Sequence, residues 1–507
     1  MTQGATTTDT QRRQNANPSV LAVLRSPRLL TREALAGLVV GLALIPEAIS
    51  FSIIAGVDPK IGLFSSFIMA VSIAFLGGRP AMITAATGAV ALVVAPIAPT
   101  YGLDYLIATI ILAGVFQIGL ALLGVAKLMR FIPRSVMVGF VNSLAILVFM
   151  AQVPHLVGVP WLVYPLVAAG ILVIAVMPWI TRAIPAPLVS VVIITTAAVV
   201  FALHVPTVGD QGELPRSLPE LFVPGVPLTW ETFSIIAPFA LAVAVVGLME
   251  SLLTAKLVDE ITDTHSNKTR ESWAQGVANM LSGFFGGMGG CAVIGQTMMN
   301  VKVSGARTRV STFLAGVFLL VLVVVLGDLV SIIPMAALVA VMIMVSVAAF
   351  DWHSIAPSTL RRRPKSETGV MLTTVLVVVL THNLAIGVIA GVLVASVLFV
   401  RRVAHVVAVD RVEVVEGGVP TARYTVTGEL FFASSNDLTT LFEYGRDPER
   451  VVIDLSRSHI WDASTVAALD AIETKYSARG TRVEIVGMNA RTSAMHSRLS
   501  GGFQSGE

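Results

Sequence analysis

Long apolar stretches that are almost free of charged residues follow one another from about Thr31 to Val400. Each is roughly 15–25 residues long, the length that a helix needs to cross the hydrocarbon core of a bilayer. Only 13% of the 507 residues are charged, against about a quarter in a soluble protein. Because so little charge cannot cover a water-facing surface, the sequence predicts an all-α polytopic membrane domain and argues against a soluble enzyme.

We predict fourteen membrane spans, of which the third and the tenth are short and rich in Gly, Ala or Pro. The spans are expected at residues 31–53, 61–77, 84–98, 105–126, 135–152, 161–180, 187–203, 233–256, 272–287, 292–301, 310–327, 333–350, 367–382 and 384–400. A polar loop at about 204–232 divides them into two halves of seven.

Basic residues lie on alternate sides of these spans. If residues 1–30 are a cytoplasmic segment, the inner loops of the membrane domain (31–402) and that segment hold 22 Lys and Arg residues. The outer loops hold only Lys60 and Arg216. Since Lys and Arg concentrate in cytoplasmic loops, we predict a multi-pass protein of the cell (inner or plasma) membrane with both termini cytoplasmic.

The composition changes after Arg402, and residues 405–507 have the patterning of a soluble domain. Strands are expected at 423–432, 451–455 and 482–486, a hairpin turn at Gly417–Gly418 and a helix at 464–478. Strands that alternate with helices predict a small cytoplasmic α/β domain.

The two membrane halves share an order of features. Glu47 lies inside the first span of the first half, and Glu250 inside the first span of the second. A Gly-broken span follows each acid, around Gly88 and around Gly295. Because seven is odd, the second half enters from the opposite side, which predicts an inverted repeat whose broken helices meet near the midplane.

A helix that begins inside the membrane presents unpaired N–H groups and the positive end of its dipole. Two such ends that face each other bind an anion without a fixed cation. We therefore predict an anion site at the glycines of the third and tenth spans. The alternative is that these glycines only ease helix packing, as in other membrane bundles.

Glu47 and Glu250 are the candidate proton-coupling residues. An ionised carboxylate inside a membrane is costly, so it faces a cavity, has a partner or is protonated. The alternative is a neutral, hydrogen-bonded packing acid. Thr254 lies one helical turn after Glu250 on the same face and is placed to share its site; otherwise its hydroxyl is exposed or bonded to its own helix.

Several segments resemble motifs of the SulP anion transporters (sulfate permease, solute carrier 26 group). The segments are Gly41–Ala48, Pro59–Ser66 with Gly77–Arg79, Gly247–Thr254, and Asn300 with Ser304–Thr308. Phe64 stands where the family usually has Tyr. The C-terminal region resembles the STAS domain (sulfate transporter and anti-sigma antagonist) that these carriers bear, so the resemblance covers nearly the whole chain.

The resemblance implies a carrier with a core (spans 1–4 and 8–11) that moves against a gate (spans 5–7 and 12–14). It implies a homodimer that moves sulfate, bicarbonate, halides, oxalate or dicarboxylates by symport or exchange. Carried over by position, Glu47 lies beside the site, and the substrate-binding residues are Thr87, Gly88, Ala89, Glu250, Thr254, Gly295, Gln296 and Thr297. No cofactor or metal is implied, and the single Cys excludes a Cys-built metal site.

Two departures from the family pattern bear on mechanism. Many members have Ser-Arg-Ser where this chain has Gly295-Gln296-Thr297, so a fixed positive charge is missing. Glu47 stands where Gln is common, which places a titratable group beside the site and favours proton-coupled symport. Such coupling suits a carboxylate or dicarboxylate, with bicarbonate and sulfate as further candidates.

Three other functions stay open. A passive anion channel or exchanger would lack steep coupling to a pH gradient, and a nucleobase–proton symporter would share the architecture without the STAS-like tail.

In the STAS-like tail, Ser464 matches the phosphorylation site of anti-sigma antagonists. We favour the alternative that Ser464 or Asp462 simply caps a helix.

Overall fold

A computed structural model describes residues 19–124, 127, 132–180, 185–404 and 407–500, in two compact units, 1–392 and 393–507. The positive-inside argument also used Arg12, Arg13, Arg130 and Arg182, which lie outside the described residues. So does the N-terminal segment up to residue 18. Each unit is described below by itself.

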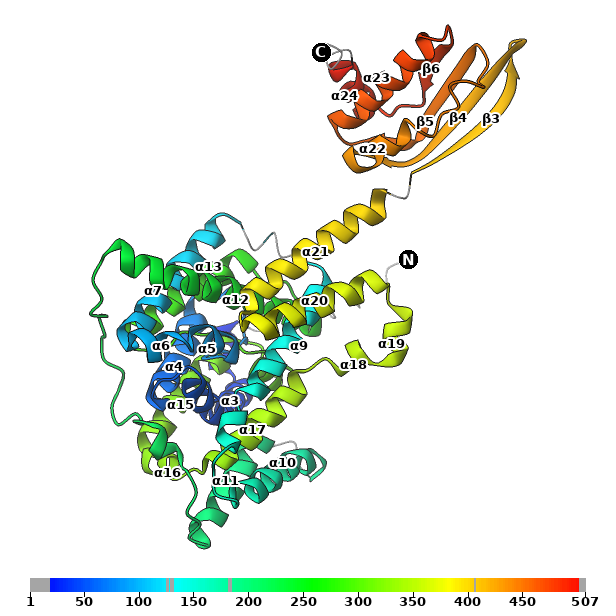
Figure 1. Ribbon diagram of the computed structural model, residues 1–507. Coiled ribbons are helices and arrows are strands. Elements are labelled where there is room, and N and C mark those ends of the chain that lie inside the picture. Colours follow the sequence, from blue (N-terminus) through cyan, green and yellow to red (C-terminus); the bar gives the residue numbers. More distant parts are fainter. Residues whose placement is uncertain (1–18, 125–126, 128–131, 181–184, 405–406, 501–507) are drawn as a thin grey trace, which may run out of the picture. The chain divides into compact units, whose positions relative to one another are not determined.

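The first unit is mostly helical, as predicted. Each of the fourteen predicted spans overlaps at least one helix, and the last helix, α21, continues into the second unit (Figure 1). The long helices are α3 (Pro27–Ile54), α4 (Pro59–Leu76), α7 (Leu103–Leu122), α9 (Arg134–Met150), α10 (Val163–Ile180), α11 (Ala186–Val200), α12 (Trp230–Thr262), α13 (Lys268–Phe284), α15 (Arg309–Val325), α17 (Met335–Ala349), α20 (Lys365–Thr381) and α21 (Leu384–Ala404). Among the described residues, seven helices are both long and apolar enough to cross a membrane. Four further apolar helices are shorter.

Short elements complete this unit. They are α2 (Val20–Arg25), α5 (Gly88–Val94), α6 (Ile97–Tyr101), α14 (Ile294–Met298), α16 (Gly327–Ser331), α18 (Trp352–Ile355), α19 (Pro357–Arg362), the 3-10 helices Val153–Leu156 and Val208–Gln211, and a π-helical turn at Met299–Val303. The third and tenth predicted spans are the broken ones. Each holds a two-residue strand, β1 (Thr84–Ala85) or β2 (Cys291–Ala292), followed by a short helix.

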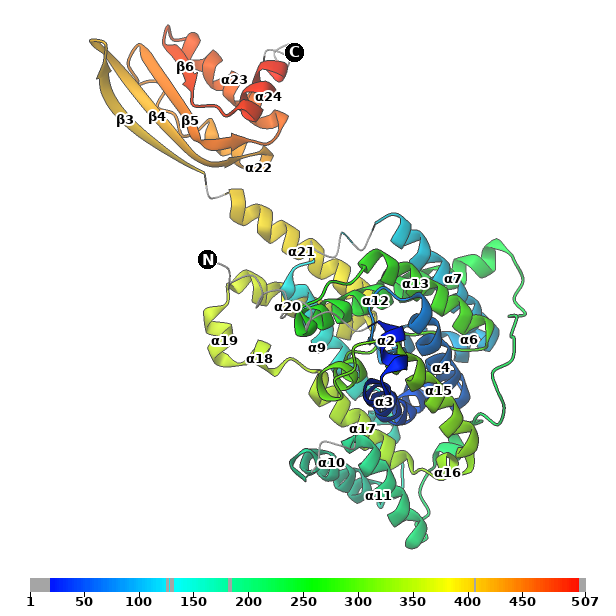
Figure 2. The ribbon, with the colours of Figure 1, turned by 180° about the vertical axis from the view of Figure 1, so that it is seen from behind.

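The long helices pack in two groups. In one group, α15 packs against α3 and α4, while α13 packs against α4 and α7. In the other, α17 packs against α9, α10 and α11, and α20 packs against α9. Figures 1 and 2 show α10, α11 and α17 side by side from opposite directions. The first group contains both broken segments, and α5 contacts α9 of the second group.

The second unit is a small α/β domain with a mixed sheet in the order β3-β4-β5-β6. Its elements are β3 (Ala408–Glu416), β4 (Val419–Leu430), α22 (Phe432–Leu438), β5 (Arg450–Ile460), α23 (Ala463–Ser477), β6 (Arg482–Val486) and α24 (Ala490–Leu499). β3 and β4 are antiparallel, and β4, β5 and β6 are parallel. The three predicted strands, the helix and the turn at Gly417–Gly418 are confirmed; β3, α22 and α24 were not anticipated.

A buried carboxylate joins three elements of this domain. Asp447 accepts hydrogen bonds from Tyr424 of β4 and Tyr476 of α23, and it pairs with Arg411 of β3. Burial, followed by the bond to Asp447, raises the pKa of both tyrosine hydroxyls. Asp462 caps α23 by accepting from the Thr465 N–H at 3.1 Å, so the capping alternative holds for this helix start.

Candidate functional site

The two broken segments meet as a short antiparallel pair. Thr84 pairs with Ala292 and Ala85 with Cys291, and the Val293 N–H extends the pairing by donating to the Ile83 carbonyl at 2.9 Å. The chains approach closely here because Gly290 has no side chain: a Cβ at this position would lie 1.9 Å from the Ala85 carbonyl oxygen. The fold thus joins the first half of the chain to the second in the middle of the helical unit.

A short helix begins directly after each strand, and the two begin differently. Thr87 caps α5, because its hydroxyl oxygen accepts from the Val90 N–H at 3.4 Å. Val293 precedes α14 and offers no side-chain acceptor. The first N–H groups of α14 therefore lack the side-chain partner that α5 has.

Glu250 of α12 is linked to the first broken segment through Cys291. The Cys291 thiol donates to Glu250 Oε2 at 2.9 Å, and its sulfur lies 3.1 Å from the Thr87 hydroxyl oxygen. All three side chains are buried. The chain Glu250–Cys291–Thr87 therefore runs from a second-half helix to the cap of a first-half helix.

Glu47 of α3 lies close enough to Gln296 of α14 for their side chains to interact. Both residues are buried, and Gln296 Oε1 has no hydrogen-bond partner among the described residues. Glu47 and Glu250 also form no salt bridge within the part of the chain that the structure describes. Each acid therefore contacts a broken segment without a basic partner, and Gln296 retains an unused acceptor beside Glu47.

The two predicted threonine ligands bond mainly to the backbone. Thr254 donates to the Glu250 carbonyl at 2.8 Å, which is the back-bonded arrangement left open above. Thr297 accepts from the Ile83 N–H at 3.0 Å and so ties α14 to β1. Both hydroxyls are buried. Their described contacts hold helices and strands together.

The predicted glycines have different surroundings. A Cβ added at Gly88 would lie 2.9 Å from Phe51 Cε1 and 3.1 Å from Val148 Cγ2. A Cβ at Gly295 would have nothing within 4 Å. Ala89, the residue after Gly88, is fully packed with 1% of its surface exposed. The first segment is therefore enclosed, whereas open space adjoins the second.

Sequence reasoning missed several residues of this region. Cys291 figured only as the single cysteine that excludes a Cys-built metal site, although it bonds to Glu250. Ser251 was not considered, although its hydroxyl accepts from the Ala292 N–H at 3.1 Å. Its position beside Glu250 in the eighth-helix motif was the available signal. Across the described residues, no three His, Cys, Asp or Glu side chains form a group that could hold a metal ion.

Comparisons with known proteins identify the family of the chain and of its C-terminal domain. The pattern of the sulfate permease family matches residues 30–165 and 160–374, and that of the STAS domain matches 414–500. A Bacillus subtilis (strain 168) protein named "Putative sulfate transporter YbaR" is 49% identical over 471 residues, which cover 93% of this chain and 97% of that protein. The bicarbonate transporter BicA of a Picosynechococcus species is 28% identical over 448 residues, covering 80% of this chain and 76% of that protein.

Two solved structures share the fold. The murine solute carrier 26 family member A9 (Slc26a9) anion transporter, in the inward-facing state, superposes with a TM-score of 0.80 at 18% identity. The match covers 94% of this chain and 88% of that one. The transmembrane domain of a cyanobacterial bicarbonate transporter BicA gives a TM-score of 0.62 at 24% identity, covering 73% of this chain and 98% of that one.

The matched family and the named relatives are transporters and not enzymes. The chain belongs to the sulfate permease (SulP) family of anion transporters and carries a C-terminal STAS domain.

Proposed function

We propose that this protein is a proton-coupled symporter of a small anion that works by alternating access. The observation that carries the proposal is the β1–β2 pair, which brings the starts of α5 and α14 together beside Glu47 and Glu250. In this proposal the anion contacts Thr87, Gly88 and Ala89 from the first segment. It contacts Gly295, Gln296 and Thr297 from the second, with Glu250 and Thr254 behind them.

The open space beside Gly295 and the unused Gln296 oxygen support binding of a polar substrate next to α14. An acceptor oxygen can accept a hydrogen bond from a protonated group, so an anion that retains an O–H, such as bicarbonate or a monoprotonated dicarboxylate, suits it. The names of the relatives point to sulfate and bicarbonate. We therefore rank these two oxyanions first and a carboxylate or dicarboxylate next.

Glu47 is the proposed proton carrier and Glu250 the second candidate. Two charges of one sign repel when they share a buried site. An anion at the helix starts would therefore favour the protonated form of a neighbouring carboxylate. By linkage, a proton on Glu47 then strengthens anion binding by the same factor.

The two helix groups support the proposal that one part of the membrane domain moves while the other stays fixed. The first group, with both broken segments, would be the moving core, and the second group the gate. The domain limits that we propose are 1–30 for the N-terminal segment, 31–402 for the transport domain and 405–507 for the STAS domain. We also propose a homodimer in the cell membrane with both termini in the cytoplasm.

The orientation has a direct test. Cysteines placed at Asp210 and at Arg361 should be labelled from the outside and from the inside, respectively, by a membrane-impermeant reagent. Cys291 is fully buried and can stay in place. Labelling of both positions from one side would contradict the even number of spans.

The function is tested in proteoliposomes with labelled sulfate, bicarbonate and a four-carbon dicarboxylate, with and without an imposed proton gradient. We expect one of these anions to accumulate against its concentration gradient when the outside is acidic. Uptake that only equilibrates would indicate a channel or an exchanger. Accumulation of a nucleobase in place of every anion would indicate a nucleobase–proton symporter.

A further inference from the structure

Helix α13 carries a row of buried polar side chains, which we call the α13 ladder: Glu271, Gln275, Asn279 and Ser282. Their spacing of four, four and three residues puts them on one face of the helix. Each has none of its surface exposed. Buried polar groups need hydrogen-bond partners to avoid a large penalty, so the partners of the ladder show what it holds.

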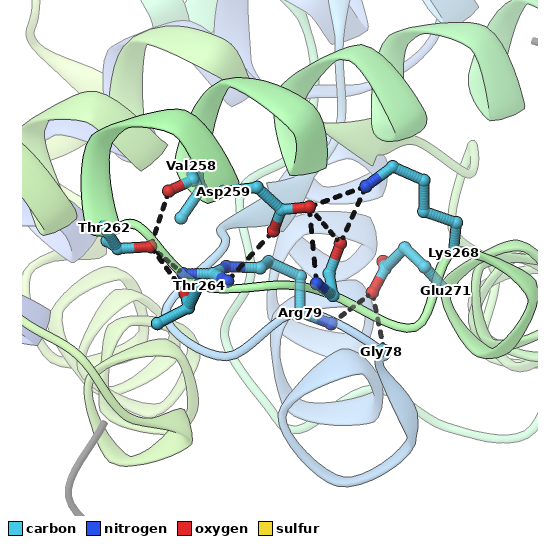
Figure 3. Close-up of polar contacts among 9 residues, drawn as sticks. Gly78, Arg79, Val258, Asp259, Thr262, Thr264, Lys268 and Glu271 are labelled. Carbon is cyan, nitrogen blue, oxygen red and sulfur yellow. Dashed lines mark hydrogen bonds and ion pairs between the residues drawn. The ribbon is translucent and has the colours of Figure 1, made fainter. Parts of the chain in front are cut away.

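The first rung holds the turn between α4 and β1. Glu271 Oε2 accepts from the N–H groups of Gly78 and Arg79 at 2.7 and 2.9 Å (Figure 3). The Arg79 guanidinium pairs with Asp259 at 3.0 Å, and Lys268 donates to the same carboxylate at 2.6 Å. This charged cluster fixes one end of the ladder at the loop between α12 and α13.

The next two rungs hold the strands themselves. Gln275 Nε2 bridges Glu271 Oε1 at 2.9 Å and the Thr84 hydroxyl of β1 at 3.1 Å. Asn279 binds Gly290, the residue before β2, through both backbone groups. Its Oδ1 accepts from the Gly290 N–H at 2.8 Å, and its Nδ2 donates to the Gly290 carbonyl at 3.1 Å. Asn279 thus acts as a further strand residue at the edge of the pair.

The last rung ties the second segment to α4. Ser282 lies 2.9 Å from the Ser65 hydroxyl, which donates to the Gly289 carbonyl at 2.6 Å. A pair of two-residue strands is too short to be stable by itself. The ladder supplies the missing fixed contacts on both chains, in the turn before β1 and in the residues before β2.

We propose that Gln275 and Asn279 are positioning residues of the anion site: they hold β1 and β2 so that α5 and α14 begin at fixed points. They touch neither helix start and act through Thr84 and Gly290. The inference rests on the proposed function, because it assigns the ladder a role in anion affinity. A ladder that only strengthened helix packing would alter stability and leave affinity unchanged.

Asn142 of α9 provides a matched control. It is a buried asparagine that also uses both ends of its amide: Nδ2 donates to Ser354 Oγ at 2.9 Å, and Oδ1 accepts from the Asp351 N–H at 2.8 Å. Its partners lie at the end of α17 and in α18, away from the strand pair. Asn279→Leu and Asn142→Leu each remove a buried amide that is bonded at both its oxygen and its nitrogen. Asn279 Nδ2 also donates to Gln117 Oε1 at 2.9 Å and to the Gln275 carbonyl at 3.1 Å, so Asn279→Leu removes more bonds within the helical unit.

The full-length variants are compared in proteoliposomes by the KM and maximal rate of labelled sulfate and bicarbonate uptake. The loss of the two bonds to Gly290 predicts that Asn279→Leu raises KM by about tenfold. Asn142→Leu should lower the melting temperature to a similar extent and leave KM within about twofold. Asn279→Asp, which keeps the acceptor for the Gly290 N–H, should give an intermediate KM. An unchanged KM in Asn279→Leu, or an equal rise in Asn142→Leu, would overturn the proposal.

A milder variant covers the case in which Asn279→Leu does not fold. Gln275 Oε1 has no hydrogen-bond partner among the described residues, so Gln275→Met removes one unsatisfied atom together with the bonds to Thr84 and to Glu271 Oε1. It should fold and raise KM by about threefold, and an unchanged KM would contradict the proposal.

A second readout needs no substrate. In Asn279→Leu and Gln275→Met, the backbone amides of residues 289–292 should exchange hydrogen at least about tenfold faster than in the unmodified protein, as expected for local opening. Asn142→Leu should leave these amides unchanged. If the unmodified protein moves no anion, the proposed function fails, while this comparison still decides the role of the ladder. Unchanged exchange at 289–292 in both ladder variants would refute it.

Discussion

Residues 84–94 and 291–298 form the same motif, a two-residue strand followed by a short helix, yet their surroundings differ. The first segment is capped by the Thr87 side chain, and Gly88 packs against Phe51 and Val148. The second lacks a side-chain cap, and Gly295 faces open space. Similar local structure is therefore closely packed at its glycine in one half of the chain and adjoins open space at its glycine in the other.

This difference separates two roles within the proposed site. A packed wall fixes geometry because close-packed interiors resist even small changes in volume. The open space at Gly295, next to the unused Gln296 oxygen, leaves room for a substrate. We expect the first segment to set the shape of the site and the second to contact most of the anion.

The largest effects should come from adding side chains at the two glycines. Gly88→Val forces overpacking against Phe51 and Val148, so it should destabilise the protein by about 1–3 kcal/mol and abolish uptake. A Cβ at Gly295 meets no atom within 4 Å, so Gly295→Val should leave the melting temperature nearly unchanged and still block uptake by filling the proposed anion space. Thermal unfolding and proteoliposome uptake measure the two effects separately.

Gly119 of α7 is the control for this pair, because a Cβ there also meets nothing within 4 Å. Gly119→Val should retain both stability and uptake. Normal transport by Gly295→Val would make that position a packing residue, and a fully stable Gly88→Val would remove the contrast between the segments.

Neutralising the two acids should give the next largest effects, and different ones. Glu250 organises the Glu250–Cys291–Thr87 chain, so Glu250→Gln replaces the carboxylate acceptor with an amide and should lower both exchange and net uptake by about tenfold. Glu47→Gln mimics the protonated acid, so it should keep anion exchange and lose accumulation driven by an inward proton gradient. Counterflow and gradient-driven uptake assays distinguish the two outcomes.

The prediction for Glu47 would be contradicted if the Glu47→Gln variant still accumulated anion against its concentration gradient when the outside is acidic. Glu47 would then not be the coupling residue, and Glu250 would become the candidate. Equal behaviour of the two variants in both assays would show that the acids do not have separate roles.

Changes at Cys291 should be smaller. Cys291→Ala removes the donor to Glu250 and the contact with Thr87, which should raise KM by about fivefold through the loss of one hydrogen bond. Cys291→Ser keeps a donor and should lie closer to the unmodified protein. Initial uptake rates at several anion concentrations provide the test, with the melting temperature as a check on folding. An unchanged KM in Cys291→Ala would remove the thiol from the site.

The smallest effect on affinity should come from removing the STAS domain. A chain that ends at Ala404 keeps every residue of the strand pair and both acids, so its KM should stay within about twofold of the full-length value. A lower maximal rate of uptake would be compatible with this prediction. A large rise in KM in a well-folded truncated protein would show that the second unit contributes to anion binding.

Much of the architecture followed from the sequence because hydrophobicity and charge act locally. The apolar stretches located the helices, and the Gly-rich third and tenth spans marked where helices break. The alternating pattern near Arg423 identified β4, and Gly417 and Gly418 have the positive φ values that a tight hairpin requires. Boundaries differed by a few residues; α13 begins at Lys268 instead of Ser272, because Asn267 caps it.

The site was only partly accessible in this way. Glu47, Glu250 and the two glycines were candidates because an acid or a helix break in an apolar span is unusual in itself. Cys291, Gln275 and Asn279 gave no such signal, since a lone cysteine and scattered amides on a helix are common. Their importance comes from contacts with residues up to about two hundred positions away, such as Cys291 with Thr87.

The sequence by itself determined that this chain crosses a membrane many times, carries an α/β domain at its end and breaks two helices in corresponding places. These properties depend on which residues prefer lipid, water or a turn. Only the tertiary structure decided that the two breaks pair as β1 and β2, that Gly88 is enclosed while Gly295 is open, and that α13 holds both strands. The physical reason is that hydrogen bonds and packing between distant segments depend on distances of a few ångströms, which local patterns do not specify.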